Sequence, residues 1–253
     1  MNMLEAAVEA AHAAGRVLME GCRGEIEVDK VTERDVKLVM DRKAEAAILS
    51  VIRMRFPKHA ILSEEAGSIQ SDSEYLWVID PLDGTVNYSR RIPMWGTSVG
   101  LMRNGEEIVG VIYDPIHDEL FTAEKGHGAF LNGRPIRVNS HNALKTAAVA
   151  FGYAADDELY RTGHQTISRV SSNVGKMRDL GTAVLHLGYV ACGRLEGFCE
   201  FGLNLWDLAA GAVIVREAGG RVDKHPLPGR RNSFAFLCSN GRIHDDLARL
   251  VEW

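Results

Sequence analysis

Long apolar runs and paired cysteines are both missing from the sequence, and each absence removes a class of protein. No apolar stretch approaches the roughly 20 residues that cross a bilayer, so we expect no membrane span. Residues 1–5 carry an early acid and no basic region, so we expect no secretory signal. The four cysteines, which lack a paired zinc spacing, are Cys22, Cys192, Cys199 and Cys238. They favour reduced thiols, several of them buried, in a cytoplasmic protein.

Basic charge is also in short supply. The formal net charge is −5, charged residues make up 25% of the chain and no Lys/Arg run occurs, so nucleic-acid binding is not indicated. Apolar residues, at 46%, are plentiful enough for a large core. Since the sequence has no internal repeat and no long linker, we predict one compact unit with an N-terminal half over residues 1–142 and a C-terminal half over residues 143–253.

The N-terminal half is predicted to combine helices with a β-rich segment. Apolar residues recur at helical spacing over residues 4–20 and again over residues 41–56. A polar loop is predicted over residues 68–75, before a buried strand over residues 76–79. Alternating segments between residues 97 and 131 predict an antiparallel meander. This half is therefore expected to be α+β.

From Ala143 onward the pattern changes to alternating strands and helices. Short apolar runs are predicted to be strands, and the amphipathic stretches between them are predicted to be helices. The strands are expected at residues 147–151, 176–180, 196–201 and 234–238. The helices are expected at residues 157–171, 184–192, 208–218 and 243–251. This order predicts an α/β half.

Two carboxylates stand three residues apart where the central strand is predicted to end. The strand is expected to stop at Asp80, because Pro81 lacks the N–H that a further ladder bond needs, and Gly84 permits a tight turn after Asp83. Two close carboxylates repel each other when both are ionised, and a hard cation such as Mg²⁺ removes that conflict. Taken alone, the stretch is more typical of an ordinary Asp-Gly turn between strands. Other segments of the chain favour the metal.

Three segments carry a resemblance to a known family. Residues 80–88 (DPLDGTVNY) resemble the first signature of the inositol monophosphatase family, and residues 205–211 (LWDLAAG) resemble the second. Ser63-Glu64-Glu65 lies upstream at the usual distance, and the resemblance runs over essentially the whole chain. It implies a layered αβαβα sandwich of the sugar phosphatase type. It also implies a Mg²⁺-dependent, lithium-sensitive phosphomonoesterase that is commonly a homodimer.

The resemblance assigns ligands for two or three Mg²⁺ ions. One ion would be held by Glu64, Asp80 and the carbonyl of Leu82, and would lower the pKa of a bound water. A second would be held by Asp80, Asp83 and Asp207 and would stabilise the leaving alkoxide, while a third, weaker ion would lie near Glu64. No basic cluster nearby in the sequence could neutralise these acids instead. No covalent phosphoenzyme is expected, because Asp80 would be occupied as a bridging ligand.

Asp41 and Thr85 would together orient the attacking water, with Glu64 as a third catalytic residue. This role for Asp41 comes from the resemblance, because an aspartate near a helix start is otherwise a favourable partner of the helix N-terminus. Lys37-Leu38 stand where the family often has Val-Thr, so the way in which Asp41 is held is an open question.

Substrate contacts are expected on both sides of the metals. Gly181 joins a predicted strand to a predicted helix, where backbone N–H groups face an anion, although an ordinary turn fits the pattern equally well. Glu200 interrupts an apolar strand, and a buried carboxylate is costly unless it has a hydrogen-bond partner. The family uses the matching position to hold a substrate hydroxyl. Asp207 is expected to cap a helix. The full set of contacts implied by the resemblance is Asp83, Gly84, Thr85, Gly181, Thr182, Ala183, Glu200 and Asp207.

The favoured function is hydrolysis of inositol 1-phosphate, a small phosphorylated polyol. Relatives that act on fructose 1,6-bisphosphate, histidinol phosphate or a nucleotide phosphate share the same metal core, and these substrates stay open. A partner-binding role with the transcription machinery is an alternative of another class.

Overall fold

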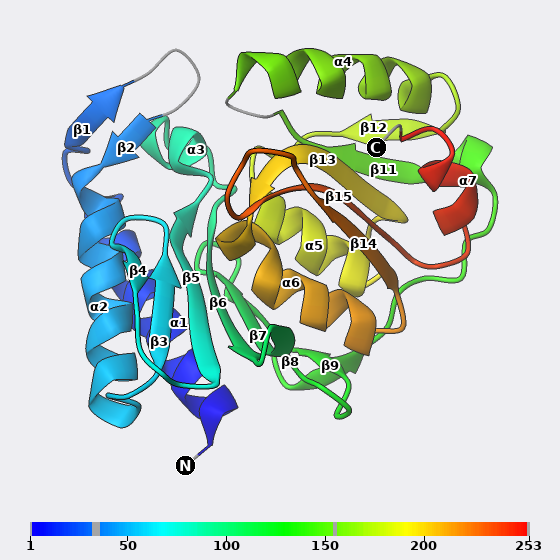
Figure 1. The fold of residues 1–253 in the computed structure, drawn as a ribbon. Helices are drawn as coiled ribbons and strands as arrows, with labels where there is room; N and C mark the ends of the chain where they lie inside the picture. The colour runs from blue at the N-terminus through cyan, green and yellow to red at the C-terminus, as the bar shows by residue number, and fades with distance from the viewer. Residues whose placement is uncertain (1, 32–35, 154–155, 252–253) are drawn as a thin grey trace.

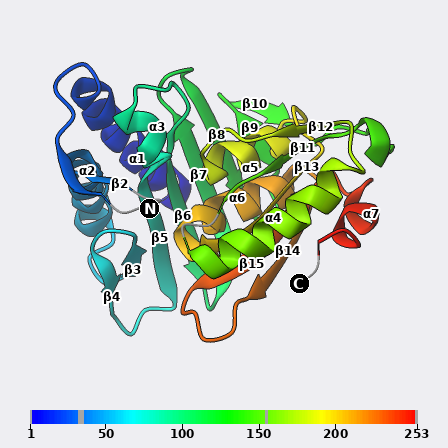
Figure 2. The same cartoon turned by 90° about the horizontal axis from the view of Figure 1, so that it is seen from above.

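Five layers, alternately helical and β, make up the computed structural model, which describes residues 2–31, 36–153 and 156–251 (Figure 1). One outer layer holds α1 (Met3–Gly21) and α2 (Val39–Arg55). The middle layer holds α5 (Ala183–Ala191) and α6 (Leu205–Glu217), which lie between the two large sheets. The other outer layer holds α4 (Asp157–Ser171) and α7 (His244–Ala248). The view from above shows α1 and α2 on one side of the first sheet and α5 and α6 on the other (Figure 2). The predicted αβαβα sandwich is confirmed.

The first large sheet has eight strands in the order β10-β9-β8-β7-β6-β5-β3-β4. Strands β5 to β10 form the predicted antiparallel meander, whereas β3 pairs with β5 in parallel. Their bounds are β3 Ala60–Ser63, β4 Gly67–Ile69, β5 Tyr75–Asp83, β6 Gly96–Arg103, β7 Glu106–Asp114, β8 Glu119–Glu124, β9 Ala129–Leu131 and β10 Arg134–Ile136. The loop predicted over residues 68–75 is wrong in part, because its first residues pair with β3 as the edge strand β4.

The second large sheet has five strands in the order β12-β11-β13-β15-β14. Strand β11 pairs in parallel with β12 and β13, and β15 is antiparallel to both of its neighbours. The bounds are β11 Ala148–Phe151, β12 Lys176–Arg178, β13 Gly197–Asn204, β14 Arg221–Pro226 and β15 Ser233–Ser239. Sequence analysis missed β14, an edge strand whose polar residues carry no alternating apolar signal.

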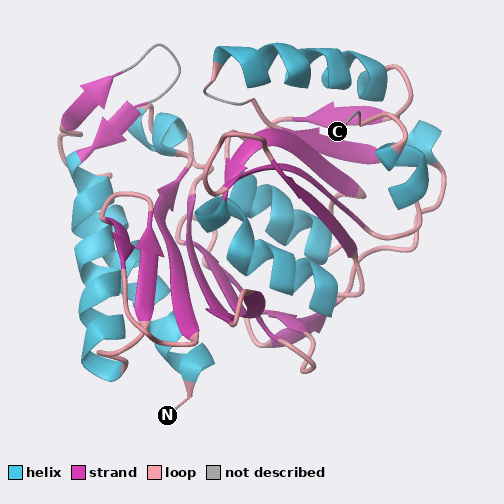
Figure 3. Cartoon of the chain, viewed as in Figure 1, coloured by secondary structure: helices cyan, strands magenta, loops and turns pink. Residues whose placement is uncertain are grey.

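Smaller elements complete the chain, as the colouring by secondary structure shows (Figure 3). A hairpin of β1 (Val28–Val31) and β2 (Val36–Leu38) precedes α2, and α3 (Thr85–Ser89) follows β5. A 3₁₀ turn spans Leu144–Thr146. Within the described part of the chain, no helix has the length and apolar character that a bilayer crossing requires. The division of the sequence at residue 142 stays a prediction.

Helix α6 lies unusually close to the first sheet. Gly100 and Gly110 face it from β6 and β7, and a Cβ on Gly110 would overlap the carbonyl oxygen of Ala210. A Cβ on Gly100 would come within 3.0 Å of the Cβ of Ala209. These glycines therefore set the depth at which α6 packs, and with it the position of the acidic residue in its first turn.

Gly110→Ala is expected to destabilise the protein by about 2 kcal/mol or more, because α6 must shift to admit the new methyl group. The matched control is Gly163→Ala in α4, where a Cβ would meet no atom within 4 Å. That change is expected to stabilise by about 0.5–1 kcal/mol, since alanine loses less backbone entropy in a helix. Urea unfolding of both variants measures the two effects, and equal stabilities would contradict the packing argument.

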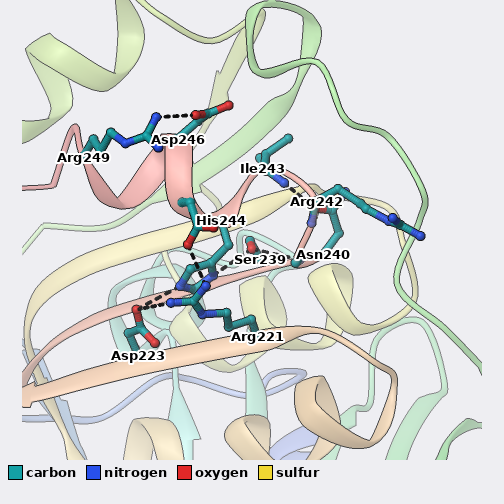
Figure 4. Close-up of polar contacts among 11 residues, drawn as sticks. Arg221, Asp223, Ser239, Asn240, Arg242, Ile243, His244, Asp246 and Arg249 are labelled. Carbon is teal, nitrogen blue, oxygen red and sulfur yellow. Dashed lines mark hydrogen bonds and ion pairs between the residues drawn. The ribbon is translucent and has the colours of Figure 1, made fainter.

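A polar network holds α7 against the second sheet (Figure 4). The ring of His244 lies 2.9 Å from Ser239 Oγ through Nδ1 and 2.9 Å from Asp223 Oδ2 through Nε2. The series Ser-His-Asp resembles a hydrolase triad, but Ser239 and His244 are completely buried. The oxygen of Ser239 also accepts a hydrogen bond from the backbone N–H of Gly241. We therefore assign this network a structural role.

Candidate active site

The end of β5 presents the two aspartates of the central motif. The strand does not stop at Asp80 as predicted; it continues to Asp83 through a bulge opposite β6. Pro81 lies inside the bulge, where a ladder N–H is not required, and its carbonyl accepts a hydrogen bond of 3.0 Å from Thr97 Oγ1. Gly84 then adopts a left-handed conformation (φ 88°) that turns the chain from β5 into α3.

Asp80 is the most enclosed acid of this group. Its side chain is buried, and Oδ1 accepts a hydrogen bond of 3.0 Å from the backbone N–H of Leu82. Burial raises its pKa well above the ordinary value, and the charges of Glu64, Asp83 and Asp207 raise it further. Four carboxyl groups therefore lie close enough to disfavour one another's ionisation.

Glu64 reaches this group from the parallel strand β3. Its backbone N–H donates to the carbonyl of Ile79 at 3.2 Å, which continues the β3–β5 pairing and sets Glu64 beside Asp80. One cation was not anticipated from the sequence: Lys37 Nζ lies 3.7 Å from Glu64 and forms an ion pair with Glu65. The β1–β2 hairpin thus brings a positive charge to the edge of the acidic group, although it is no basic cluster.

Glu45 supports the Glu64 loop and was missed by the sequence analysis. It is buried in α2 and accepts hydrogen bonds from Ser63 Oγ and from the N–H of Ala66, the latter at 2.9 Å. Its position four residues after Asp41, on the same face of α2, is the signal that could have identified it.

Asp41 and Thr85 lie close together, and the structure shows how Asp41 is held although Leu38 stands where the family often has threonine. The backbone N–H of Leu38 donates to Asp41 Oδ2 at 2.5 Å, so Asp41 needs no hydroxyl at that position to hold it. Thr85 Oγ1 lies 3.4 Å from Asp41 Oδ1 and donates to the carbonyl of Leu82 at 3.0 Å. Burial raises the pKa of Asp41 to about 7, an effect that the Leu38 hydrogen bond opposes.

Asp83 connects β5 to the start of α5. Its Oδ2 accepts hydrogen bonds from the hydroxyl of Thr182 and from the N–H of Val184, the latter at 2.8 Å. Burial raises the pKa of Asp83, while these hydrogen bonds work in the opposite direction. The loop of Gly181, Thr182 and Ala183 is thereby brought against the central motif.

Asn87 also links the central motif to the 181–183 loop. It lies within the first signature, but the sequence analysis gave it no role. Its Nδ2 donates to the carbonyls of Met94 and Leu180, both at 2.7 Å. A Cβ on Gly181 would come within 2.8 Å of this nitrogen, so glycine is needed at that position. Asn87 therefore fixes the distance between α3 and the 181–183 loop.

Asp207 lies in the first turn of α6 but is not its cap. The helix begins at Leu205 rather than at residue 208, Asn204 is the capping position, and Asp207 Oδ2 accepts from the N–H of Asn204 at 2.7 Å. Burial raises the pKa of Asp207 well above its ordinary value, and the charges of Asp83 and Glu64 add to the shift.

Glu200 projects from β13 toward the same acids. The sequence predicted that its carboxylate would hydrogen-bond something, yet none of the described residues donates to it. Burial raises the pKa of Glu200 well above the ordinary value, and the charges of Asp207, Asp83 and Asp179 raise it further. Gly152 packs against it so closely that a Cβ would overlap Oε2.

One cleft of about 350 Å³ collects nearly all of the predicted site residues. Asp41 is absent from its lining and lies behind Thr85. The predicted residues that line the cleft are Glu64, Asp80, Leu82, Asp83, Gly84, Thr85, Gly181, Thr182, Ala183, Glu200 and Asp207. The lining residues that the sequence analysis gave no role include Asn87, Tyr153, Asp179 and His186.

The donors in the cleft suit a hard divalent cation. Among residues 2–31, 36–153 and 156–251, no three acidic, histidine or cysteine side chains are already arranged as a metal-binding group. The carboxylates nevertheless raise one another's pKa, and carboxylate and backbone carbonyl oxygens are the ligands that Mg²⁺ prefers. The chemistry of the donor set therefore fits the expected metal.

Comparison with known sequences gives consistent results. A sequence model of the inositol monophosphatase family matches residues 1–251. The chain is 40% identical to an inositol-1-monophosphatase from Synechocystis sp. over 253 residues, which cover 98% of this chain and 88% of that protein. It is 39% identical to the Nus factor SuhB of Escherichia coli (strain K12) over 224 residues, or 87% of this chain and 84% of the relative.

Solved structures show the same layered fold. The extragenic suppressor protein suhB from Bartonella henselae has a TM-score of 0.91 and 37% identity, with 98% of this chain and 97% of that chain covered. An inositol monophosphatase from Anabaena (Nostoc) sp. has a TM-score of 0.86 and 40% identity, with 98% and 94% covered. Both likenesses extend over nearly the full length of each chain.

Proposed function

Because the chain belongs to the inositol monophosphatase family and is a phosphatase, we propose that its substrate is inositol 1-phosphate. The observation that carries this proposal is that one cleft holds carboxylates suited to two kinds of partner. The carboxylates around Asp80 suit metal ions and a phosphate group. The carboxylate of Glu200, to which no described residue donates, suits a substrate hydroxyl.

The family is generally metal-dependent, and we propose Mg²⁺ here, with two or three ions bound. Glu64, Asp80 and the Leu82 carbonyl would hold one, and Asp80, Asp83 and Asp207 would hold another. When bound, Mg²⁺ makes water a better nucleophile and offsets negative charge on the phosphate ester.

The protein's own groups position the attacking water and accept its proton. Asp41 and Thr85 lie 3.4 Å apart, so a water molecule can bond to both. Oδ1 of Asp41 would accept the proton of that water, in the role of a general base. The backbone N–H groups of Gly84 and Thr85 would donate to the phosphoryl oxygens, where charge develops. The 181–183 loop would form the opposite wall.

Steady-state kinetics over a substrate panel tests this function. We expect the highest kcat/KM for inositol 1-phosphate, because a polyol offers hydroxyl groups to Glu200. The panel should also contain fructose 1,6-bisphosphate, histidinol phosphate and a nucleotide monophosphate, since the proposed metal ligands would serve all of them. A higher kcat/KM for one of these would replace the proposed substrate, and failure to hydrolyse any of them would refute a phosphomonoesterase role.

A second candidate function is supported by the name of some relatives. Proteins 39–40% identical to this chain are called Nus factor SuhB, which favours a partner-binding role with the transcription machinery. We propose a homodimer as the form that would act in either role. A pull-down from the native host, with the phosphatase-inactive protein as bait, separates this role from catalysis.

A further inference from the structure

His186 is a buried histidine in the wall of the proposed active site. It lies on α5, four residues after Thr182, and lines the cleft while exposing almost none of its own surface. Its ring contacts Phe198 of β13, with the ring centroids 4.6 Å apart. Phe198 and Glu200 are two residues apart in one strand, so their side chains leave the same face of the sheet. His186 and Glu200 therefore lie near each other in the wall of the cleft.

The hydrogen bonds of His186 determine which nitrogen carries the proton. Nε2 accepts a hydrogen bond of 2.9 Å from the backbone N–H of Leu180, so it cannot itself be protonated. Burial lowers the pKa of the ring to about 3, which keeps it neutral at physiological pH. The single proton of the neutral ring must then lie on Nδ1. His186 consequently offers one N–H donor.

That donor has no acceptor among the residues that the structure describes. Within the described parts of the chain, Nδ1 of His186 is the buried side-chain nitrogen or oxygen that lacks any hydrogen-bond partner. A buried donor without a hydrogen-bond partner lowers the stability of the fold by about 1–3 kcal/mol, and a hydrocarbon side chain at this position would avoid that cost. His186 nevertheless lines the cleft, which gives a reason for the cost to be tolerated.

We propose that His186 is a specificity-determining residue, whose Nδ1–H donates a hydrogen bond to a hydroxyl oxygen of the substrate alcohol beside Glu200. The inference rests on the proposed phosphatase function and names the chemistry that its site selects. A hydroxyl group both accepts and donates, so it satisfies His186 and Glu200 together. An ammonium group can only donate, and a methylene group can do neither. The pair therefore favours a polyol phosphate over an amino-alcohol phosphate or a simple alkyl phosphate.

Two substitutions separate the donor from the acceptor of this ring. The amide of Gln reaches the position of Nε2, so His186→Gln keeps an acceptor for Leu180 and removes the Nδ1–H donor. The shorter Asn places its amide near Nδ1, so His186→Asn keeps the donor and gives up the bond to Leu180. Thermal unfolding first establishes that both variants are folded.

The test compares inositol 1-phosphate with cyclohexyl phosphate, which has the same ring size and no hydroxyl groups. His186→Gln is expected to lose about tenfold in kcat/KM for inositol 1-phosphate and distinctly less for cyclohexyl phosphate. His186→Asn is expected to lose similar amounts on both, because its effect acts through the 181–183 loop. An equal loss on both substrates in His186→Gln would overturn the proposal.

A binding measurement keeps the inference testable if wild-type protein hydrolyses neither ester, an outcome that would refute only the proposed function. Myo-inositol is titrated, with cyclohexanol as the control, into protein carrying ¹⁵N-labelled histidine. The Nδ1–H resonance of His186 is expected to shift with myo-inositol alone. No shift with myo-inositol, or an equal shift with cyclohexanol, would mean that His186 does not recognise hydroxyl groups.

Discussion

Asp83→Asn is expected to lower kcat/KM by about a thousandfold, the upper end of what removing one electrostatic stabiliser costs. The change replaces a charged ligand, proposed to hold metal in the cleft, by a neutral side chain of nearly the same shape. Sensitivity to lithium, expected from the family resemblance, should be lost or altered at the same time. Steady-state kinetics at saturating Mg²⁺ measures the loss.

The fold is expected to survive this change. With its oxygen at the position of Oδ2, Asn can still accept from both the N–H of Val184 and the hydroxyl of Thr182. Loss of a buried charge also favours the folded state. The free energy of unfolding of the metal-free variant should therefore lie within about 1 kcal/mol of the wild-type value. Asp246→Asn is the control, since Asp246 lies in α7 and, among the described residues, its side chain pairs with Arg249 alone. Near-native turnover by Asp83→Asn would reduce Asp83 to a turn and packing residue.

Removal of metal is expected to abolish turnover completely and to leave a protein whose stability falls as the pH rises. Without a cation, the carboxylates around Asp80 retain their mutual repulsion, and nothing supplies the charge that a phosphate ester needs. Mg²⁺ added back should restore activity. Turnover at the wild-type rate by metal-stripped protein in excess EDTA would falsify the metal mechanism.

The pH dependence follows from the raised pKa values. Asp41 has a pKa of about 7 when folded, against an ordinary value of 3.8, so between about pH 4 and pH 7 the folded state binds more protons than the unfolded state. Stability is therefore greatest at the lower end of this window and is lost as the pH rises through it. Asp80, Asp207 and Glu200 act with the same sign. Acids with lowered pKa values, such as Glu107, have the opposite effect, but only at lower pH.

Thermal unfolding in EDTA at about pH 5 and about pH 7 measures this trend. The metal-free protein should unfold at a lower temperature at the higher pH, and Asp41→Asn should weaken the difference. The proposed Mg²⁺ would bind the ionised carboxylates, so it should raise the unfolding temperature most at the higher pH. A metal-free protein that is more stable at about pH 7 would show that the acids are not buried together.

Elements with a strong local pattern were predictable from the sequence. Helix α4 begins and ends as predicted, and the meander strands lie within a residue or two of their expected positions. The edge strands β4 and β14 were missed, because their pairing depends on a neighbour distant in sequence rather than on their own apolar residues. The continuation of β5 through Pro81 was also missed. Only the pairing with β6 shows that Pro81 lies in a bulge, where no ladder hydrogen bond from its nitrogen is needed.

The candidate site divides in the same way. Signature segments led to the residues that line the cleft, including Asp80, Asp83 and Asp207. Supporting residues such as Glu45 and Lys37 were missed, since an acid in a helix or a lysine in a polar stretch is typical of a surface. Their partners lie across the fold: Glu45 meets the loop after β3, and Lys37 meets Glu65. Sequence periodicity indicates which face of a helix or strand is buried, but it does not identify the residues that pack against that face.

The position of the acids along the chain gives the cleft an order of assembly during translation. Asp80 and Asp83 leave the ribosome more than a hundred residues before Glu200 and Asp207. A nascent chain that ends before α5 also lacks the N–H groups that bind the Asp83 carboxylate. The end of β5 can therefore acquire its full set of partners only after the helices that lie between the two sheets have been synthesised. Hydrolytic competence therefore requires a chain that has been synthesised at least as far as Asp207 in α6.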